Sequence, residues 1–138
     1  MKEELYHARI LELAKRKTGA GRLEAPDASI TLDNPLCGDR VTLDLRFDRG
    51  RIAEVGHKTR GCLLCQAAAT VIAEQAPGMA PDDLQHLAGA VRPSLRERPE
   101  ELGARWPALA AFAPVHGHKS RYDCVLLPFD ALRQALTR

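Results

Sequence analysis

The four cysteines of this sequence lie in three short segments, and they are the residues best suited to chemistry. The first segment is Asn34-Pro35-Leu36-Cys37-Gly38-Asp39. A thiolate and a carboxylate two residues apart can both face one metal ion, and Gly38 allows another group to approach the loop closely. The alternative is a simple turn, in which Asp39 caps the backbone and Cys37 is a buried thiol.

The second segment, Gly61-Cys62-Leu63-Leu64-Cys65, precedes an alanine-rich apolar run. A cysteine at a helix N-terminus meets unpaired backbone N–H groups and the positive end of the helix dipole, which favour the thiolate of Cys62. Cys65 follows one turn later on roughly the same face. A C-x-x-C pair also occurs in thioredoxin-like redox proteins, but there it belongs to a βαβ pattern, whereas here it follows a predicted hairpin.

The third segment is Arg121-Tyr122-Asp123-Cys124, at the predicted start of the last helix. Taken alone, Cys124 reads as a small buried hydrophobic residue. However, all three segments lie at boundaries between elements, and such boundaries can meet at one end of a sheet. We therefore expect a shared site. Histidines are weaker candidates for metal ligands, namely His57, His116 and His118.

Hydrophobic periodicity predicts the elements that position these segments. Apolar and polar residues alternate from Val41 to Phe47 and return from Ile52 to Thr59, with turn residues between them, which indicates a β-hairpin. An earlier strand begins near Ile30. The fold class is therefore α+β, with a small three-stranded antiparallel sheet packed against helices.

Helical spacing predicts the remaining elements. An amphipathic helix covers Lys2–Lys17, an apolar helix covers Cys62–Gln75, and a short helix runs from Pro81 to Leu87. Three prolines between Val91 and Pro107 predict broken helix and loop. The last helix covers Ser120–Leu136, where Pro128 must either kink the helix or lie in its first turn.

Composition limits the classes of function. The 138 residues predict one domain, 1–138, and the 45% of apolar residues can form a core without disulfides. A net charge of +2 and only 4% aromatic residues argue against nucleic acid as a partner. No apolar run is long enough for a membrane helix, and the charged N-terminus does not read as a signal peptide. We expect a cytoplasmic protein whose cysteines stay reduced.

The three cysteine segments together resemble the IscU/SufU/NifU N-terminal family of iron–sulfur cluster assembly proteins. The resemblance rests on Asn34-Pro35-x-Cys37-Gly38-Asp39, on Gly61-Cys62 before an alanine-rich helix, and on Arg121-x-x-Cys124-x-x-Leu127 followed by Ala131-Leu132. These motifs occur in the family's order and span nearly the whole chain.

The resemblance implies that Cys37, Asp39, Cys62 and Cys124 are the ligands, at one end of the sheet. It implies a scaffold that binds iron and a transient [2Fe-2S] cluster and receives sulfur from a cysteine desulfurase, with cluster-acceptor proteins as further partners. Asp123 stands where IscU has a histidine, and the long segment before Cys124 is similar to the SufU branch. That branch implies instead a zinc ion and a role as persulfide acceptor, with Cys37 as the accepting thiol.

The cysteines are also compatible with two other functions. A structural zinc domain would use the same ligands only to hold its fold. A thiol oxidoreductase would use Cys62 and Cys65 but would leave the Cys-Gly-Asp motif without a role. In the family comparison Cys65 replaces a small or hydroxylated residue, so it is a candidate accessory thiol, either a resolving thiol or an extra ligand, or else a small core residue.

Overall fold

The computed structural model describes residues 7–35, 38–104 and 106–137. A three-stranded antiparallel sheet of order β1-β2-β3 is formed by β1 (Ala28–Asn34), β2 (Asp39–Asp48) and β3 (Arg51–Arg60). The predicted alternation is confirmed, because the apolar side chains of β2 are buried on one face. Arg49 and Gly50 both have positive φ, as the two-residue turn of a tight hairpin requires.

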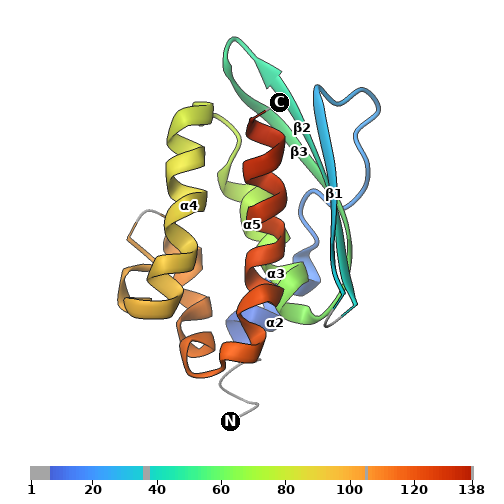
Figure 1. Ribbon diagram of the computed structural model, residues 1–138. Helices are drawn as coiled ribbons and strands as arrows, with labels where there is room; N and C mark the ends of the chain where they lie inside the picture. Colours follow the sequence, from blue (N-terminus) through green and yellow to red (C-terminus); the bar gives the residue numbers. More distant parts are fainter. Residues whose placement is uncertain (1–6, 36–37, 105, 138) are drawn as a thin grey trace.

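Helices cover one face of this sheet (Figure 1). They are α2 (Ala8–Arg16), α3 (Leu63–Gln75), α4 (Pro81–Glu97) and α5 (Tyr122–Leu136), and short 3-10 segments join the last two. Helix α5 lies over β1 and β2, α3 lies beside it over β3, and α4 packs on α5 on the side away from the sheet. This arrangement confirms the predicted α+β fold.

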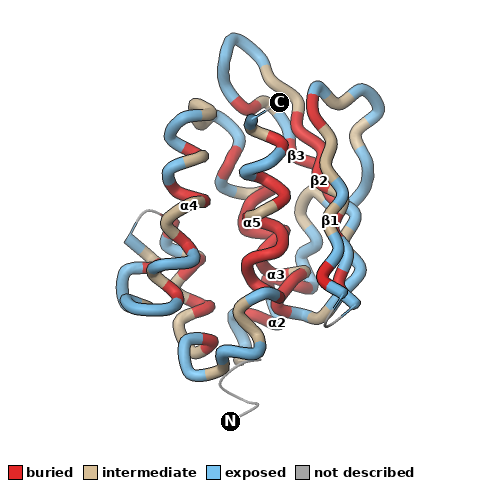
Figure 2. The backbone as a smooth tube through the Cα atoms, in the orientation of Figure 1, coloured by how far each residue is buried: buried red, intermediate tan, exposed pale blue. Residues whose placement is uncertain are grey.

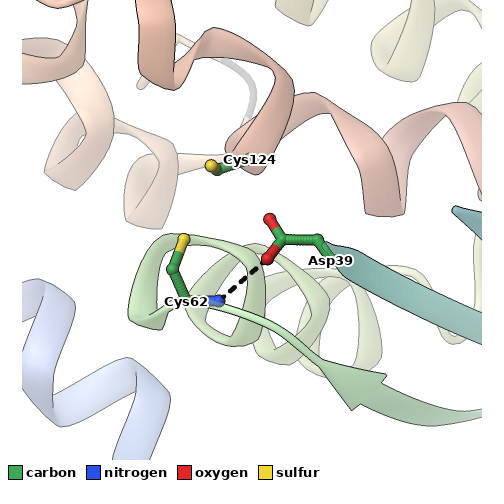
Figure 3. A group of neighbouring side chains, drawn as sticks. All are labelled: Asp39, Cys62 and Cys124. Carbon is green, nitrogen blue, oxygen red and sulfur yellow. Dashed lines mark hydrogen bonds between the residues drawn. The ribbon is translucent and has the colours of Figure 1, made fainter. Parts of the chain in front are cut away.

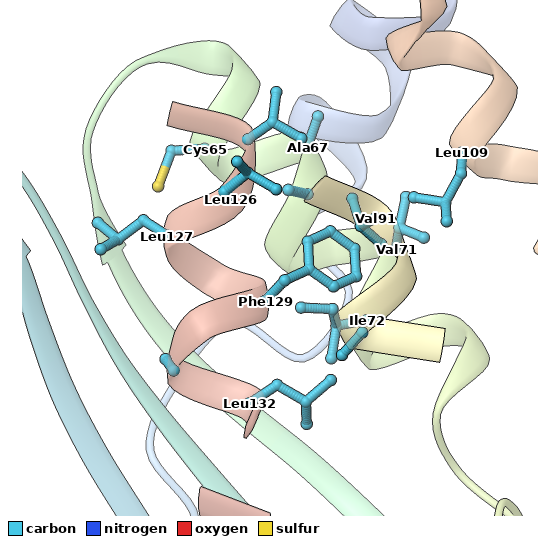
Figure 4. Close-up of a cluster of buried hydrophobic side chains, with 14 of the residues drawn as sticks. Cys65, Ala67, Val71, Ile72, Val91, Leu109, Leu126, Leu127, Phe129 and Leu132 are labelled. Carbon is cyan, nitrogen blue, oxygen red and sulfur yellow. The ribbon is translucent and has the colours of Figure 1, made fainter. Parts of the chain in front are cut away.

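The core lies between the sheet and the helices (Figure 2), and α3 contributes the longest unbroken run of buried residues among the described helices. Every residue of α3 from Ala67 to Ala73 is buried, and the alanines among them let neighbouring helices approach closely. Phe129 and Leu132 of α5 pack into the same cluster (Figure 4). Because each large apolar side chain contributes about 1.5–3 kcal/mol when fully buried, this cluster is the main source of stability.

The connector before β1, residues 17–27, wraps around the β3 edge of the sheet. Gly21 donates its backbone N–H to the His57 carbonyl at 2.7 Å, and His57 donates back to Gly19 at 2.9 Å. On the outer face, Arg22 reaches the buried Asp44 carboxylate at 2.7 Å. The β3 edge is therefore covered here, and His57 serves to hold the connector.

The structure corrects one prediction about the helices and decides another. The predicted helix Pro81–Leu87 continues to Glu97, because Val91 and Leu95 extend the buried stripe begun by Leu84 and Leu87, and Pro93 is exposed within it. Of the two positions predicted for Pro128, the structure excludes the first turn, because Pro128 lies in the interior of α5. Tertiary burial outweighs the local preference of proline in both helices.

Candidate metal centre

Asp39 is the first residue of β2, and its side chain is buried among the ends of three elements. Its Oδ1 accepts a hydrogen bond from the backbone N–H of Cys62 at 3.2 Å. Its Oδ2 is buried, and the described part of the chain provides it with no hydrogen-bond partner. Burying a carboxylate oxygen without a hydrogen-bond donor costs free energy, and a cation bound at this atom would offset that cost.

The thiols of Cys62 and Cys124 lie beside this carboxylate (Figure 3). Cys62 is the N-cap residue of α3 and is half-buried, whereas Cys124 lies in the first turn of α5 and is buried. One ligand atom from each of Asp39, Cys62 and Cys124 can be chosen so that all three lie within 4.8 Å of one another. The starts of β2, α3 and α5 therefore bring together three of the predicted ligands.

The environment of Cys62 favours the thiolate that a metal site requires. The pKa of Cys62 is lowered from 9.0 to about 7, and the largest influence is the interaction with the Cys124 thiol. Burial and the negative charge of Asp39 act in the opposite direction. The backbone N–H groups of Cys65 and Leu64, at the start of α3, also lower the pKa of Cys62. The thiol of Cys62 makes no capping hydrogen bond to the helix. These two N–H groups act in the direction that the sequence predicts for a helix N-terminus.

These three donors fit a metal ion. Thiolates are the soft ligands that zinc and iron–sulfur clusters prefer, and a carboxylate can complete a tetrahedral site. The surroundings of Asp39 test this fit. Its Oδ2 is buried and has no hydrogen-bond donor among the described residues, and a bound cation would compensate its negative charge.

The fourth predicted ligand, Cys37, lies outside the described residues. The structure does place its neighbours: Gly38 has a φ of 76° and donates its N–H to the Asn34 carbonyl at 2.8 Å. Asn34 is opposite Asp39 in the β1–β2 pairing, so the loop that carries Cys37 begins and ends beside the centre. The role of Cys37 as a ligand remains a prediction.

Cys65 and Asp123 lie apart from this group. Cys65 is fully buried in the hydrophobic core, close to Leu126 and Leu127 of α5 (Figure 4). The Asp123 carboxylate is largely exposed and lies 4.0 Å from Arg92 of α4. The accessory role of Cys65 remains a prediction, and its burial favours the reading as a small core residue.

Two of the three histidines that the sequence offered as weaker candidates, His57 and His116, have other contacts. Nε2 of His57 bonds the Thr18 carbonyl at 2.9 Å, and Nδ1 bonds Thr59. Nδ1 of His116 bonds the Leu95 carbonyl at 2.9 Å. Sequence reasoning missed the hydrogen bond from the backbone N–H of Cys62 to Asp39, because the two residues meet only through tertiary packing.

The fold and the centre define a small α+β domain with a candidate metal site of two thiols and a carboxylate. The family described as NifU-like N terminal domain matches residues 5–104. The chain belongs to this family. Across the described residues, no helix has the length and apolar character needed to cross a membrane.

Relatives of known sequence carry names from the same family. The iron-sulfur cluster assembly scaffold protein IscU of Streptococcus pyogenes is 25% identical over 134 residues, covering 97% of this chain and 84% of that protein. The protein of the same name from Thermotoga maritima is 24% identical over 136 residues, covering 97% and 94%.

Solved structures agree with this assignment. The N-terminal NifU-like protein from Brucella abortus has a TM-score of 0.86 at 31% identity, covering 99% of this chain and 94% of that one. A candidate iron-sulfur cluster assembly scaffold protein for the SUF system from Fervidobacterium islandicum has a TM-score of 0.89 at 26% identity and covers 99% of both chains.

Proposed function

We propose that this chain is an iron–sulfur cluster assembly scaffold whose ligand set is Cys37, Asp39, Cys62 and Cys124. One observation carries the proposal: donor atoms of Asp39, Cys62 and Cys124 gather within 4.8 Å, at the starts of β2, α3 and α5. The Cys37 loop leaves and rejoins the sheet beside them, which supports a fourth ligand. Relatives across the whole length are named as scaffolds of this kind.

The cargo is a [2Fe-2S] cluster, which the protein holds and then releases to an acceptor protein. Three thiolates suit iron in a cluster, and a carboxylate is the weakest ligand of such a set, so it is the one we expect to leave first. The second candidate is a SufU-like protein that binds zinc and accepts sulfur from a cysteine desulfurase. The similar structure named for the SUF system supports the SufU branch. A cytoplasmic location is part of either proposal, because cysteine thiols remain reduced there.

Sulfur would come from a cysteine desulfurase as a persulfide. The Cys37 thiolate attacks the outer sulfur of the donor persulfide, a new S–S bond forms on Cys37, and the donor cysteine leaves as a thiolate. This exchange needs no net oxidation. Cys62 is the N-cap of α3 and Cys124 is buried in α5, whereas the sequence predicts a loop at Cys37. This contrast supports Cys37 as the accepting thiol.

The deciding experiment is purification without oxygen, followed by measurement of iron, sulfide and zinc and of the visible absorption spectrum. A coloured protein with stoichiometric iron and sulfide supports the scaffold. A colourless protein with one zinc ion supports the sulfur acceptor. A protein that binds neither zinc nor a reconstituted cluster would contradict both.

A second experiment locates the sulfur acceptor. After incubation with a cysteine desulfurase and cysteine, we expect mass spectrometry to find the added sulfur on Cys37. Cys37→Ser should abolish acceptance, whereas the matched control Cys65→Ser should retain it because Cys65 is buried in the core. Added sulfur on Cys124, or acceptance by Cys37→Ser, would disprove this assignment.

A further inference from the structure

Gly61 lies between the end of β3 and Cys62, with the carboxylate of Asp39 directly against it. A Cβ atom on Gly61 would lie 2.5 Å from Oδ1 of Asp39 and 2.8 Å from its Cγ. The backbone of Gly61 does not adopt the positive φ that favours glycine. A side chain is therefore excluded here by the position of the Asp39 carboxylate and not by backbone conformation.

The two oxygens of the Asp39 carboxylate have different surroundings. Oδ1, the atom that a Cβ on Gly61 would displace, accepts the hydrogen bond from the Cys62 N–H at 3.2 Å. Oδ2 is buried without a partner in the described part of the chain, and Figure 3 shows it turned toward Cys124. A carboxylate is planar, so fixing Oδ1 on the Cys62 amide also fixes the direction of Oδ2.

We propose that Gly61 is a positioning residue for the metal ligand Asp39. Because Gly61 has no side chain, Oδ1 can reach the Cys62 amide, and this contact turns Oδ2 toward the two thiols. The inference rests on the proposed role of Asp39 as a ligand. It adds that the ligand set depends on a residue that has no side chain with which to bind a metal.

The experiment compares Gly61→Ala, Asp39→Ala and the double variant, using cobalt(II) as a spectroscopic probe and zinc affinity from competition with a chromophoric chelator. We expect the d–d bands of cobalt-loaded Gly61→Ala to match those of Asp39→Ala and to differ from the parent, while thiolate-to-cobalt bands persist in all three. Zinc affinity should fall by about tenfold in both single variants, the range typical of residues that orient a ligand.

The double variant separates positioning from a general effect on the fold. Without the Asp39 carboxylate the added methyl group meets no oxygen, so the double variant should bind zinc like Asp39→Ala alone, which is the non-additivity expected of coupled residues. If Gly61→Ala does not fold, the double variant should fold, because the clash has been removed. A double variant that also fails to fold, or effects that add, would overturn the inference.

A matched control is Gly56→Ala on β3. Its Cβ would lie 2.8 Å from the Gly21 carbonyl oxygen and 2.9 Å from Leu23, so it is equally crowded but distant from the ligands. Gly56→Ala should lower the melting temperature without changing the cobalt spectrum. If Asp39→Ala binds metal like the parent, the ligand assignment fails, and this inference fails with it. If Asp39→Ala changes the spectrum but Gly61→Ala does not, only the role of Gly61 is wrong.

Discussion

The thiol of Cys62 lies between opposing influences, and their balance decides its reactivity. The interaction with the Cys124 thiol and the N–H groups at the start of α3 favour the thiolate, whereas burial and the charge of Asp39 oppose it. The net result is a pKa of about 7 instead of 9.0. By linkage, this ionisation stabilises the fold fully above pH 9, and its contribution is lost as the pH falls through 7.

We therefore expect metal-free protein to react with iodoacetamide at Cys62 with a midpoint near pH 7, measured as the rate of modification of the Cys62 peptide by mass spectrometry. Cys124→Ala should move the midpoint upward, because the largest stabilising contact is lost. Asp39→Ala should move it downward, because a negative charge is removed. Cys65, which is fully buried, is the internal control and should react only after unfolding. A parent midpoint near pH 9 would refute this account.

At the scale of elements, α4 extends beyond its predicted end at Leu87 to Glu97. A substitution at Gly89 tests directly whether the chain is helical there. Gly89 lies inside α4, and an added Cβ would make only ordinary contact, 3.8 Å from the Arg133 guanidinium. Because glycine is unfavourable inside a helix, Gly89→Ala should raise the free energy of unfolding by about 0.5–1 kcal/mol in urea denaturation. Gly103→Ala, whose Cβ would lie 3.1 Å from Ala110, is the control and should give no such gain. No change in Gly89→Ala would argue that the helix ends near Leu87.

One buried carboxylate, that of Asp44, anchors the connector to the sheet. Although burial alone would raise the pKa of Asp44, hydrogen bonds from Arg22, Ser29 and the Leu23 amide outweigh it and lower that pKa. Asp44→Ala should therefore lower the free energy of unfolding by about 2 kcal/mol, the scale of a hydrogen bond to a charged group. Zinc affinity should not change, because Asp44 faces away from the centre.

Asp33→Ala is the matched control for Asp44→Ala. Its carboxylate is 58% exposed and pairs with Arg40, so its loss should change the free energy of unfolding by less than about 1 kcal/mol. Both variants would be compared by urea denaturation of metal-free protein at neutral pH. Equal effects would show that burial of Asp44 does not matter. A weaker zinc affinity in Asp44→Ala would show that the connector and the centre are coupled.

The sequence predicted those strands and helix starts that depend on hydrophobic periodicity and on residues close together in the chain. The period of two in Val41–Phe47 gave β2, and the break after Gly61 placed Cys62 at the start of α3. The continuation of α4 through Pro93 could not be predicted locally, because it depends on burial of Val91 and Leu95 against other elements. The same limit applies to the centre: spacing suggested its ligands, but the contact of Asp39 with the Cys62 amide exists only in the folded chain.

At the scale of the whole molecule, the hydrophobic core includes Cys124 of the centre but extends well beyond it. Residues of α2, α3, α4, α5 and the sheet belong to one hydrophobic cluster, among them Ile10 of α2, Val41 of β2, Leu64 of α3, Leu84 of α4 and Phe129 of α5. A chain of 138 residues with such a core does not need a metal to fold. A structural zinc domain, in contrast, gains its folding free energy from the metal.

Removal of the metal distinguishes these two cases. After treatment with a chelator we expect helical circular dichroism to persist and urea unfolding to remain cooperative. Added zinc should stabilise the protein by mass action, by about 2.7 kcal/mol at a concentration one hundred times the dissociation constant. Cys124→Ala should lose most of this increment, whereas Cys65→Ser should keep it even if its core packing is weaker. Loss of helical structure on chelation would instead show that the metal holds the fold together, and the protein would then be a structural zinc domain.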